Sequence, residues 1–584
     1  MRHPENLFDW NYWLTTWPAE PVLLTRANAA DGYPRALTPL SQDLILPFED
    51  AGVRRFFEET LGAMSPSDAP LPYLCALWGH VYINADQLAN LGAVLPGSSR
   101  QSIYQQYMGL NPDPDFRPAS PSVGARLGAL RTAGPVLTGM LSAARTARER
   151  FAAQAAQARA LRPVGEPGER ECLAWLLGLE SLMTAAWESL MIGPGIASAT
   201  FEVCEKVIAK ATGRPSADLN NRLHVGLGGN ESAEAGRMVG RLAALARANP
   251  AVAEAVAADA PVARIRQLDP VFGHELAVGL ERFGFHTAPE LEIAQPTWRQ
   301  QPGQLLAMVA RELQRPVEER AADDRAAEVR RAAEAELAEG VRRPLRPLVG
   351  RVLRLSRSQM ALRENAKVPI VLIFDEVRRV LEAAAPSLVA RGALVAPADA
   401  VYLRYDELKG VLAGAGAPAA AELERRAAEH ERCLRLELPE LVEAGPGYAV
   451  PITERHVRER GLLPAAPVDE RTTVLTGTGA SAGRVTGVAR VLGDPLDDFD
   501  PGDVLIAKTV DPGWSAALSC AGAVVLDIGG GLSHGAVVAR ELGIPCVVNV
   551  KAGTTAIRDG STVTVDGSTG EVFLEARALT EHTD

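Results

Sequence analysis

The chain has 584 residues, of which 47% are hydrophobic and 23% charged, a composition typical of a globular protein with several domains, and one that excludes wholesale disorder, a collagen-like repeat and a disulfide scaffold. Its formal net charge of −12 is opposite to that of a protein that binds phosphate backbones, so we expect no nucleic-acid partner. We also expect no membrane span, a cytoplasmic location, buried thiols and no metal site, because there is no long apolar run or signal pattern and the six cysteines lack metal spacing.

The first 460 residues divide into two stretches of different amino-acid composition. Residues 1–100 are rich in Trp, Tyr and Pro, with turn clusters that predict an irregular region of short strands and helices. From 101 to 460, Ala, Leu, Arg and Glu recur at helical spacing, which predicts a largely helical domain. Its clearest helices are expected at 143–161, 233–248 and 318–339.

Residues 461–476 have the Pro, Ala and Gly content of a linker, and a change of pattern follows them. Short β-branched runs separated by Gly and Asp predict strands at 484–492, 503–508, 523–526, 546–550, 562–565 and 571–574. One helix is expected at about 535–542, ending at Gly543 with Pro545 beyond it. The sequence therefore predicts a multidomain α+β chain that closes with a small α/β domain at 477–576.

A glycine loop joins a predicted buried strand to this helix. Gly529, Gly530 and Gly531 allow close backbone approach, and Ser533 and His534 follow at the predicted helix start, where amides and the helix dipole favour an anion. The pattern suits a phosphoryl group held by the three glycines and Ser533, with a neutral, nucleophilic His534 as its covalent carrier. The alternative is a tight turn in which His534 is an ordinary capping residue.

The stretch 527–548 resembles the phosphohistidine motif of the swivelling domain in phosphoenolpyruvate-utilising enzymes. It departs from that family at 479–483, where relatives commonly have Pro after the Ser. Within the family, the rest of the chain resembles the rifampicin phosphotransferase branch. The matching segments are 25–28, 38–40, 79–84, 226–230, 282–286, 296–299, 363–367 and 399–403.

The resemblance implies roles for residues in the helical body, which it identifies as an acceptor domain. Arg363 and Lys367 fall on the family's Arg-Glu-x-x-Lys element, where two cations stabilise the moving phosphoryl group. They are four residues apart in a predicted helix, which would place them on one face, although such a pair is ordinarily a solvated surface feature. His286 falls near the family's Gly-His-Arg, here in the order Gly-Phe-His, and is implied to bind substrate; a core or loop histidine is the alternative.

The resemblance also implies how the phosphoryl group arrives. The sequence has no Gly-x-x-x-x-Gly-Lys-Ser/Thr loop, and relatives carry an ATP-grasp domain before the region where this chain begins. We therefore expect that the chain alone binds no cofactor, that ATP and Mg²⁺ bind to a separate ATP-grasp protein, and that the phosphoryl group passes through His534 to a hydroxyl of a small organic acceptor. The alternative is a repurposed or non-transferring binding or regulatory protein that retains the phosphotransferase fold.

Overall fold

The structure is a computed structural model that describes residues 21–574, apart from 27–28, 62–72, 93–98, 102–103, 105–122, 228–230, 315–321, 437, 446–447, 453–457, 459–471, 496, 511–513 and 532. The chain divides into two compact units. Unit 1 comprises Met1–Phe201, Phe285–Thr297 and Ser358–Pro464, and unit 2 comprises Glu202–Gly284, Trp298–Arg357 and Ala465–Asp584. Most of the predicted linker lies outside the described residues, and its last three residues form a strand, β6.

Unit 1 contains a five-stranded antiparallel sheet in the order β2-β3-β1-β4-β5. The strands are β1 (Val22–Thr25), β2 (Leu74–Leu77), β3 (His80–Asn84), β4 (Leu441–Gly445) and β5 (Tyr448–Pro451). Strand β1 lies between β3 and β4, so that Leu24 pairs with Val442. A hairpin near residue 445 thus completes a sheet that begins near residue 22, a pairing that the sequence analysis did not predict.

Helices surround this sheet and build the largest core of the molecule. They are α1 (Ala29–Gly32), α2 (Pro39–Arg55), α3 (Ala85–Gly92), α5 (Val123–Ala160), α6 (Glu169–Thr212), α14 (Arg346–Asn365), α15 (Val368–Ala390), α16 (Tyr405–Leu412) and α17 (Ala420–Leu434), with a π-helix, η1 (Phe56–Thr60), and a 3₁₀ helix, η5 (Pro397–Tyr402). The boundary between the units falls within α6 and α14. Helix α15 is central, because Ile373, Phe374 and Val377 are fully buried in the core.

The region 1–100 contains the short strands and helices that were predicted, but also one longer helix. Helix α2 runs for 17 residues, with Pro39 in its first turn after Thr38. A proline suits the first turn of a helix because its missing N–H has no intrahelical partner there. The prolines of this region therefore do not all mark irregular chain.

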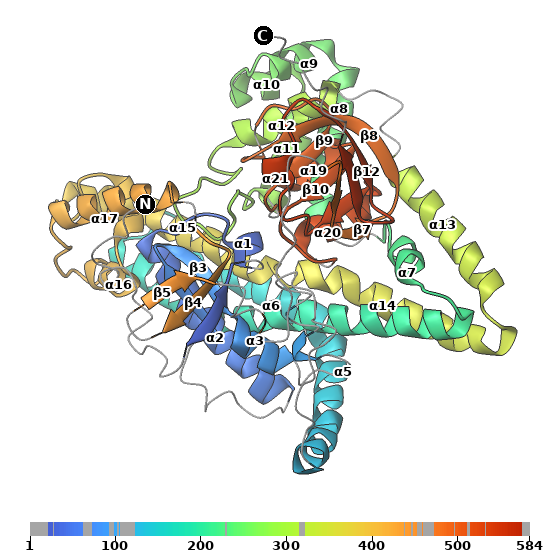
Figure 1. Cartoon of the computed structure of the whole chain (residues 1–584). Coiled ribbons are helices and arrows are strands. Elements are labelled where there is room, and N and C mark those ends of the chain that lie inside the picture. The colour runs from blue at the N-terminus through green and yellow to red at the C-terminus, as the bar shows by residue number, and fades with distance from the viewer. Residues whose placement is uncertain are drawn as a thin grey trace, which may run out of the picture. The chain divides into compact units, whose positions relative to one another are not determined.

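Unit 2 begins with a helical layer, drawn mainly in green in Figure 1. Its helices are α7 (Ala217–Leu223), α8 (Glu231–Ala248), α9 (Pro250–Ala257), α10 (Val262–Leu268), α11 (Pro270–Phe283), α12 (Pro302–Gln314) and α13 (Ala322–Gly340), followed by a 3₁₀ turn, η4 (Arg343–Leu345). The predicted helix at 233–248 corresponds to α8. That at 318–339 corresponds to α13, with 318–321 outside the described residues, and that at 143–161 lies within α5, apart from Leu161, which directly follows it.

The remainder of unit 2 is an eight-stranded sheet in the order β6-β13-β12-β8-β9-β10-β11-β7 (Figure 1, orange and red). Its strands are β6 (Val474–Thr476), β7 (Thr478–Ser481), β8 (Arg484–Val491), β9 (Val504–Ala507), β10 (Ala523–Leu526), β11 (Cys546–Val548), β12 (Thr562–Asp566) and β13 (Glu571–Leu574). Strands β8 to β11 are parallel, and the helices α19 (Ser515–Cys520), α20 (His534–Leu542) and α21 (Gly553–Ala556) lie between strands in sequence.

These elements confirm the predicted fold class, a multidomain α+β chain that closes with a small α/β domain. All six predicted strands are present within two residues of their expected ends, whereas β6 and β7 were not predicted. All six cysteines are free and buried, as expected. In the described part of the chain, no helix is long and apolar enough to cross a membrane, and no group of three or more His, Cys, Asp or Glu side chains is arranged to hold a metal ion.

Candidate functional site

The predicted glycine loop leaves the end of β10, a strand whose four residues are all buried. The main chain at the start of the loop is tied to the end of β9, because Asp527 N–H donates to Ala507 O at 3.1 Å and Ile528 N–H donates to Lys508 O at 2.9 Å. A parallel strand therefore extends its hydrogen bonds into the loop. The loop leaves the sheet at its carboxyl edge, where ligands bind in open α/β sheets.

The carboxylate of Asp527 also holds the start of the loop, through contacts with α21. It accepts hydrogen bonds from the Thr554 N–H at 3.1 Å and from the Thr554 hydroxyl, and a Cβ at Gly553 would lie 2.8 Å from its Oδ1. Burial raises the pKa of Asp527, although the bonds from Thr554 act in the opposite direction. A glycine at 553 is thus required for this carboxylate to reach the N-terminus of α21.

The three glycines form the turn itself. Gly529 has a φ of +135°, a conformation that side-chain-bearing residues rarely adopt. The turn closes where Ser533 N–H donates to Gly530 O at 2.9 Å. The glycines remain partly exposed, whereas Ser533 and His534 are buried. Glycine backbone is therefore accessible at this turn, as a phosphate-holding loop requires.

His534 is the first residue of α20, and it is 0% exposed. The N-cap position belongs to Ser533, whose side chain makes no capping hydrogen bond. The alternative in which His534 is the capping residue therefore does not hold, because the N-cap is Ser533. At the other end, Gly543 adopts the left-handed conformation with φ +66°, and Ile544 N–H donates to Ala539 O at 2.9 Å, so the helix ends as predicted.

Arg540 was not among the predicted site residues, but it contacts the loop. The residue is 1% exposed, and its guanidinium donates through Nη2 to the carbonyl oxygens of Gly531 and Ala480, both at 2.7 Å. The sequence contained a signal for this role, because Arg540 interrupts the apolar run of α20. A charged side chain in such a run is buried only where it is hydrogen bonded.

Arg363 and Lys367 lie in unit 1, whereas His534 lies in unit 2. They are not on one helix, because α14 ends at Asn365 and Lys367 is the N-cap residue of α15. The cause is Pro369 in the first turn of α15, since proline disfavours a helix that continues through the preceding turn. The argument from spacing four within a helix was therefore wrong. Both side chains are partly exposed, and Lys367 has no ion pair with a carboxylate in the part of the chain that the structure describes.

The helix crossing beside Arg363 is tight. A Cβ at Gly193 of α6 would lie 2.6 Å from the Ala366 Cβ and 3.1 Å from the Arg363 Cα. Close packing of α6 against the end of α14 thus fixes the main chain from which Arg363 projects.

His286, the predicted substrate-binding residue, is buried in unit 1. Its Nδ1 lies 2.6 Å from Glu290 Oε1, and its ring lies against Phe285 with centroids 4.4 Å apart. The segment is anchored by Arg378, which donates to the carbonyl oxygens of Glu290 at 2.9 Å and Glu292 at 2.7 Å. These contacts are those of the core-histidine alternative.

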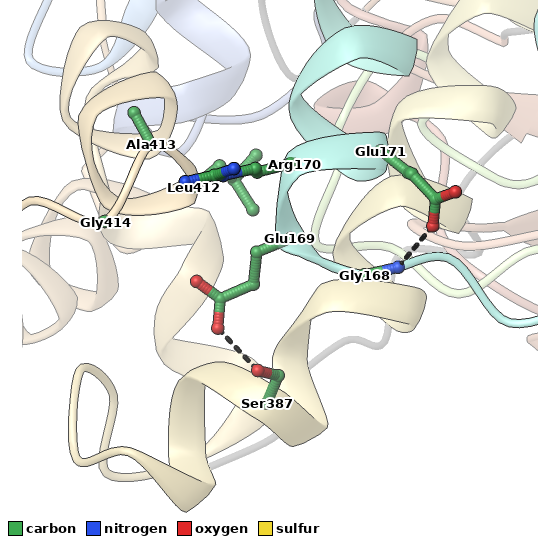
Figure 2. Close-up of a pocket in the computed structure, with 8 residues that line it drawn as sticks. All are labelled: Gly168, Glu169, Arg170, Glu171, Ser387, Leu412, Ala413 and Gly414. Carbon is green, nitrogen blue, oxygen red and sulfur yellow. Dashed lines mark hydrogen bonds between the residues drawn. The ribbon is translucent and has the colours of Figure 1, made fainter.

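Two surface hollows are described in unit 1, and neither is lined by a predicted site residue. The larger, of about 560 Å³, is lined by Gly168, Glu169, Arg170, Glu171, Ser387, Leu412, Ala413 and Gly414. Figure 2 shows that its carboxylates are engaged locally, Glu169 by the Ser387 hydroxyl and Glu171 by the Gly168 N–H. The second, of about 400 Å³, lies between 391–395 and 416–423. Neither hollow adds a residue to the candidate site.

Two family models match parts of this chain. Residues 189–364 match the fourth domain of rifampicin phosphotransferase, and residues 499–570 match the mobile domain of phosphoenolpyruvate-utilising enzymes. The second match contains the glycine loop, His534 and Arg540. The first contains Arg363 and ends before Lys367.

Several relatives share longer stretches. An uncharacterised protein of Mycobacterium tuberculosis is 32% identical over 68% of this chain and 42% of its own length. The prodigiosin synthesizing transferase PigC of Serratia marcescens is 29% identical over 51% of this chain and 33% of its own. A rifampicin phosphotransferase of a Streptomyces species is 32% identical over 50% of this chain and 34% of its own. The chain spans less than half the length of these relatives, and in its two matched domains it is similar to the phosphoenolpyruvate-utilising enzymes and, among them, to rifampicin phosphotransferase.

Proposed function

We propose that the chain is the phosphohistidine component of a phosphotransferase, in which His534 carries a phosphoryl group to a small organic acceptor. The observation that carries the proposal is the position of His534 as the first residue of α20, directly after a glycine loop, within the segment that matches the mobile domain. The free amides at a helix N-terminus and its dipole favour a bound anion. A phosphoryl group on the His534 ring would lie beside these donors.

The proposed reaction has two in-line steps. In the first, a ring nitrogen of His534 attacks the γ-phosphorus of ATP, so that a P–N bond forms, the P–O bond to ADP breaks and ADP leaves. In the second, an acceptor hydroxyl attacks the same phosphorus, the P–N bond breaks, the neutral imidazole is regenerated and the hydroxyl proton passes to solvent or a base. The covalent intermediate links two sites that need not share a pocket.

The donor and the acceptor form the finer part of the proposal. ATP and Mg²⁺ would bind to an ATP-grasp protein separate from this chain. In the acceptor step, Arg363 and Lys367 would neutralise charge on the moving phosphoryl group. The tight helix crossing at Gly193 supports a fixed position for Arg363, and the partial exposure of both side chains leaves them able to reach a ligand.

The test is to incubate the chain with [γ-³²P]ATP, Mg²⁺ and a candidate ATP-grasp protein and to look for a label that acid removes and base does not. The expected result is one labelled site, which His534→Ala abolishes. His274→Ala is the matched control, because His274 is an exposed histidine of the same unit on α11 and lies outside the loop. Equal labelling of His534→Ala and the unmodified chain would overturn the assignment.

A second candidate function is a non-transferring binding or regulatory protein that retains the fold. The observation in its favour is that His534 is fully buried, so its imidazole must become exposed before it can react. The same labelling experiment separates the two candidates. If no donor that labels an active relative labels this chain, the chain is the non-transferring protein.

A further inference from the structure

Arg540 occupies an unusual position for an arginine. It is the seventh residue of the nine-residue α20, and its side chain is buried with 1% exposed. In an α-helix the Cα–Cβ bonds tilt toward the N-terminus, so a long side chain in the last turns extends back along the helix toward its start. The guanidinium of Arg540 reaches Gly531, nine residues earlier, at 2.7 Å from the carbonyl oxygen.

The same guanidinium also holds a strand. Its Nε and Nη2 donate to the carbonyl oxygen of Ala480 in β7, at 3.1 and 2.7 Å, and Nη2 lies 3.4 Å from Asn221 Oδ1. Strand β7 pairs with β11, the strand that follows α20. One side chain therefore connects the last glycine of the loop, the histidine helix and the sheet edge beside that helix.

The chemistry of this contact depends on arginine. The guanidinium carries five N–H donors in a rigid planar fork, whereas the lysine ammonium is a single charge on a flexible stem. A lysine at this position keeps the positive charge, but it cannot hold the Ala480 and Gly531 carbonyls in the same planar arrangement. The fork sets the direction of the Gly531 carbonyl, and with it the orientation of the loop that precedes His534.

We propose that Arg540 is a positioning residue for the glycine loop: its bonds to Gly531 and Ala480 order the loop that precedes His534, and phosphoryl transfer to His534 depends on that order. The inference deepens the proposed function and rests on it. Arg540 acts through the loop and does not itself touch the reacting atoms.

The experiment compares the unmodified chain with Arg540→Lys and with a matched control, Arg311→Lys. Arg311 also donates to two main-chain carbonyls of unit 2, those of Pro495 at 3.0 Å and Asp497 at 2.8 Å, but neither belongs to the glycine loop. Amide hydrogen exchange is followed in peptides that cover 527–537 and in peptides of β9 and β10. Chemical labelling of His534 is followed with [³²P]phosphoramidate as the probe.

The expected result for Arg540→Lys is faster exchange confined to 527–537 and a fall in the His534 labelling rate of roughly ten- to a hundred-fold, since misplacement by about 1 Å costs up to about a hundred-fold. Arg311→Lys should leave both unchanged. Loop exchange and labelling equal to those of the unmodified chain would overturn the positioning role. If the unmodified chain is not labelled at His534 by phosphoramidate or by ATP with a partner, the proposed function fails instead, while the exchange data still decide whether Arg540 orders the loop.

A second variant covers loss of folding. If Arg540→Lys loses protection in β9 and β10 as well, Arg540→Gln, which retains two amide donors without the charge, is measured in the same way. Loop-confined loss in Arg540→Gln supports the proposal. Loss of protection throughout unit 2 in both variants would overturn it, because Arg540 would then maintain the whole unit and not the loop.

Discussion

Gly535, the second residue of α20, is the position beside His534 where the structure leaves least room. A Cβ at this residue would lie 2.5 Å from Leu526 Cδ1 and 2.6 Å from Val510 Cγ2. Both neighbours are buried, with Leu526 1% exposed and Val510 1% exposed. The change Gly535→Ala therefore forces a methyl group into filled space between the histidine helix and β10.

Two opposing effects decide how much Gly535→Ala changes the free energy of unfolding. Overpacking a filled core costs about 1–3 kcal/mol, whereas replacing Gly by Ala inside a helix stabilises by up to about 1 kcal/mol. Both contacts are shorter than 3.0 Å, and Val510 is β-branched and has little rotamer freedom, so the steric cost exceeds the helix gain. We expect a net loss of about 1–2 kcal/mol, which for a compact unit of more than about 200 residues, such as unit 2, lowers the midpoint of thermal unfolding by at least about 2 °C.

The assay is thermal unfolding of the full chain. Hydrogen exchange of α20 is then measured to assign the transition to unit 2. Gly240→Ala in α8 is the control, because a Cβ there meets no heavy atom within 4 Å, so only the helix gain remains and the chain should be slightly stabilised. If Gly535→Ala proves as stable as Gly240→Ala, the tight packing behind His534 and the reasoning from it are wrong.

Three further predictions follow from the site and the core. His534→Ala should abolish the acid-labile label while β9 and β10 keep their protection from hydrogen exchange, although removing a buried imidazole leaves a cavity and lowers the unfolding midpoint of the chain. A retained label contradicts the prediction. Arg363→Ala or Lys367→Ala should each slow product formation roughly thirty- to a thousand-fold, the equivalent of about 2–4 kcal/mol in the transition state, with phosphohistidine still formed, and normal product formation would leave them as surface cations. Burial raises the pKa of Glu49 to about 8, against the hydrogen bond from Tyr33. An unfolded Glu has a pKa of about 4.3, so between that pH and about pH 8 the folded chain holds a proton on Glu49 that the unfolded chain has lost. The free energy of unfolding therefore falls as the pH rises through that window. Glu49→Gln should remove this fall. If the denaturation midpoint of the variant drops between about pH 5 and pH 9 as much as that of the unmodified chain, the prediction is contradicted.

Several features of the candidate site could be predicted because they are local in sequence. The strand-loop-helix order around 523–542, the helix end at Gly543 and the glycine that needs positive φ all follow from residue types within about 20 positions. Local signals also misled: the spacing of Arg363 and Lys367 resembled a helical pair, yet Pro369 lay two residues beyond and ends that helix. A proline so close downstream was a readable signal, since its effect extends to the preceding turn.

The sequence by itself determined the fold class, the position of the glycine loop before His534 and the order of the strands along the chain, because hydrophobic period, glycine and proline act on neighbouring residues. Only the tertiary structure decided which distant segments meet. Leu24 of β1 pairs with Val442 of β4, and the Arg540 guanidinium donates to the carbonyl oxygen of Ala480, 60 positions earlier. The burial of His534 is of the same kind. Such contacts depend on how whole elements pack around a shared core, and residue spacing carries no record of that packing.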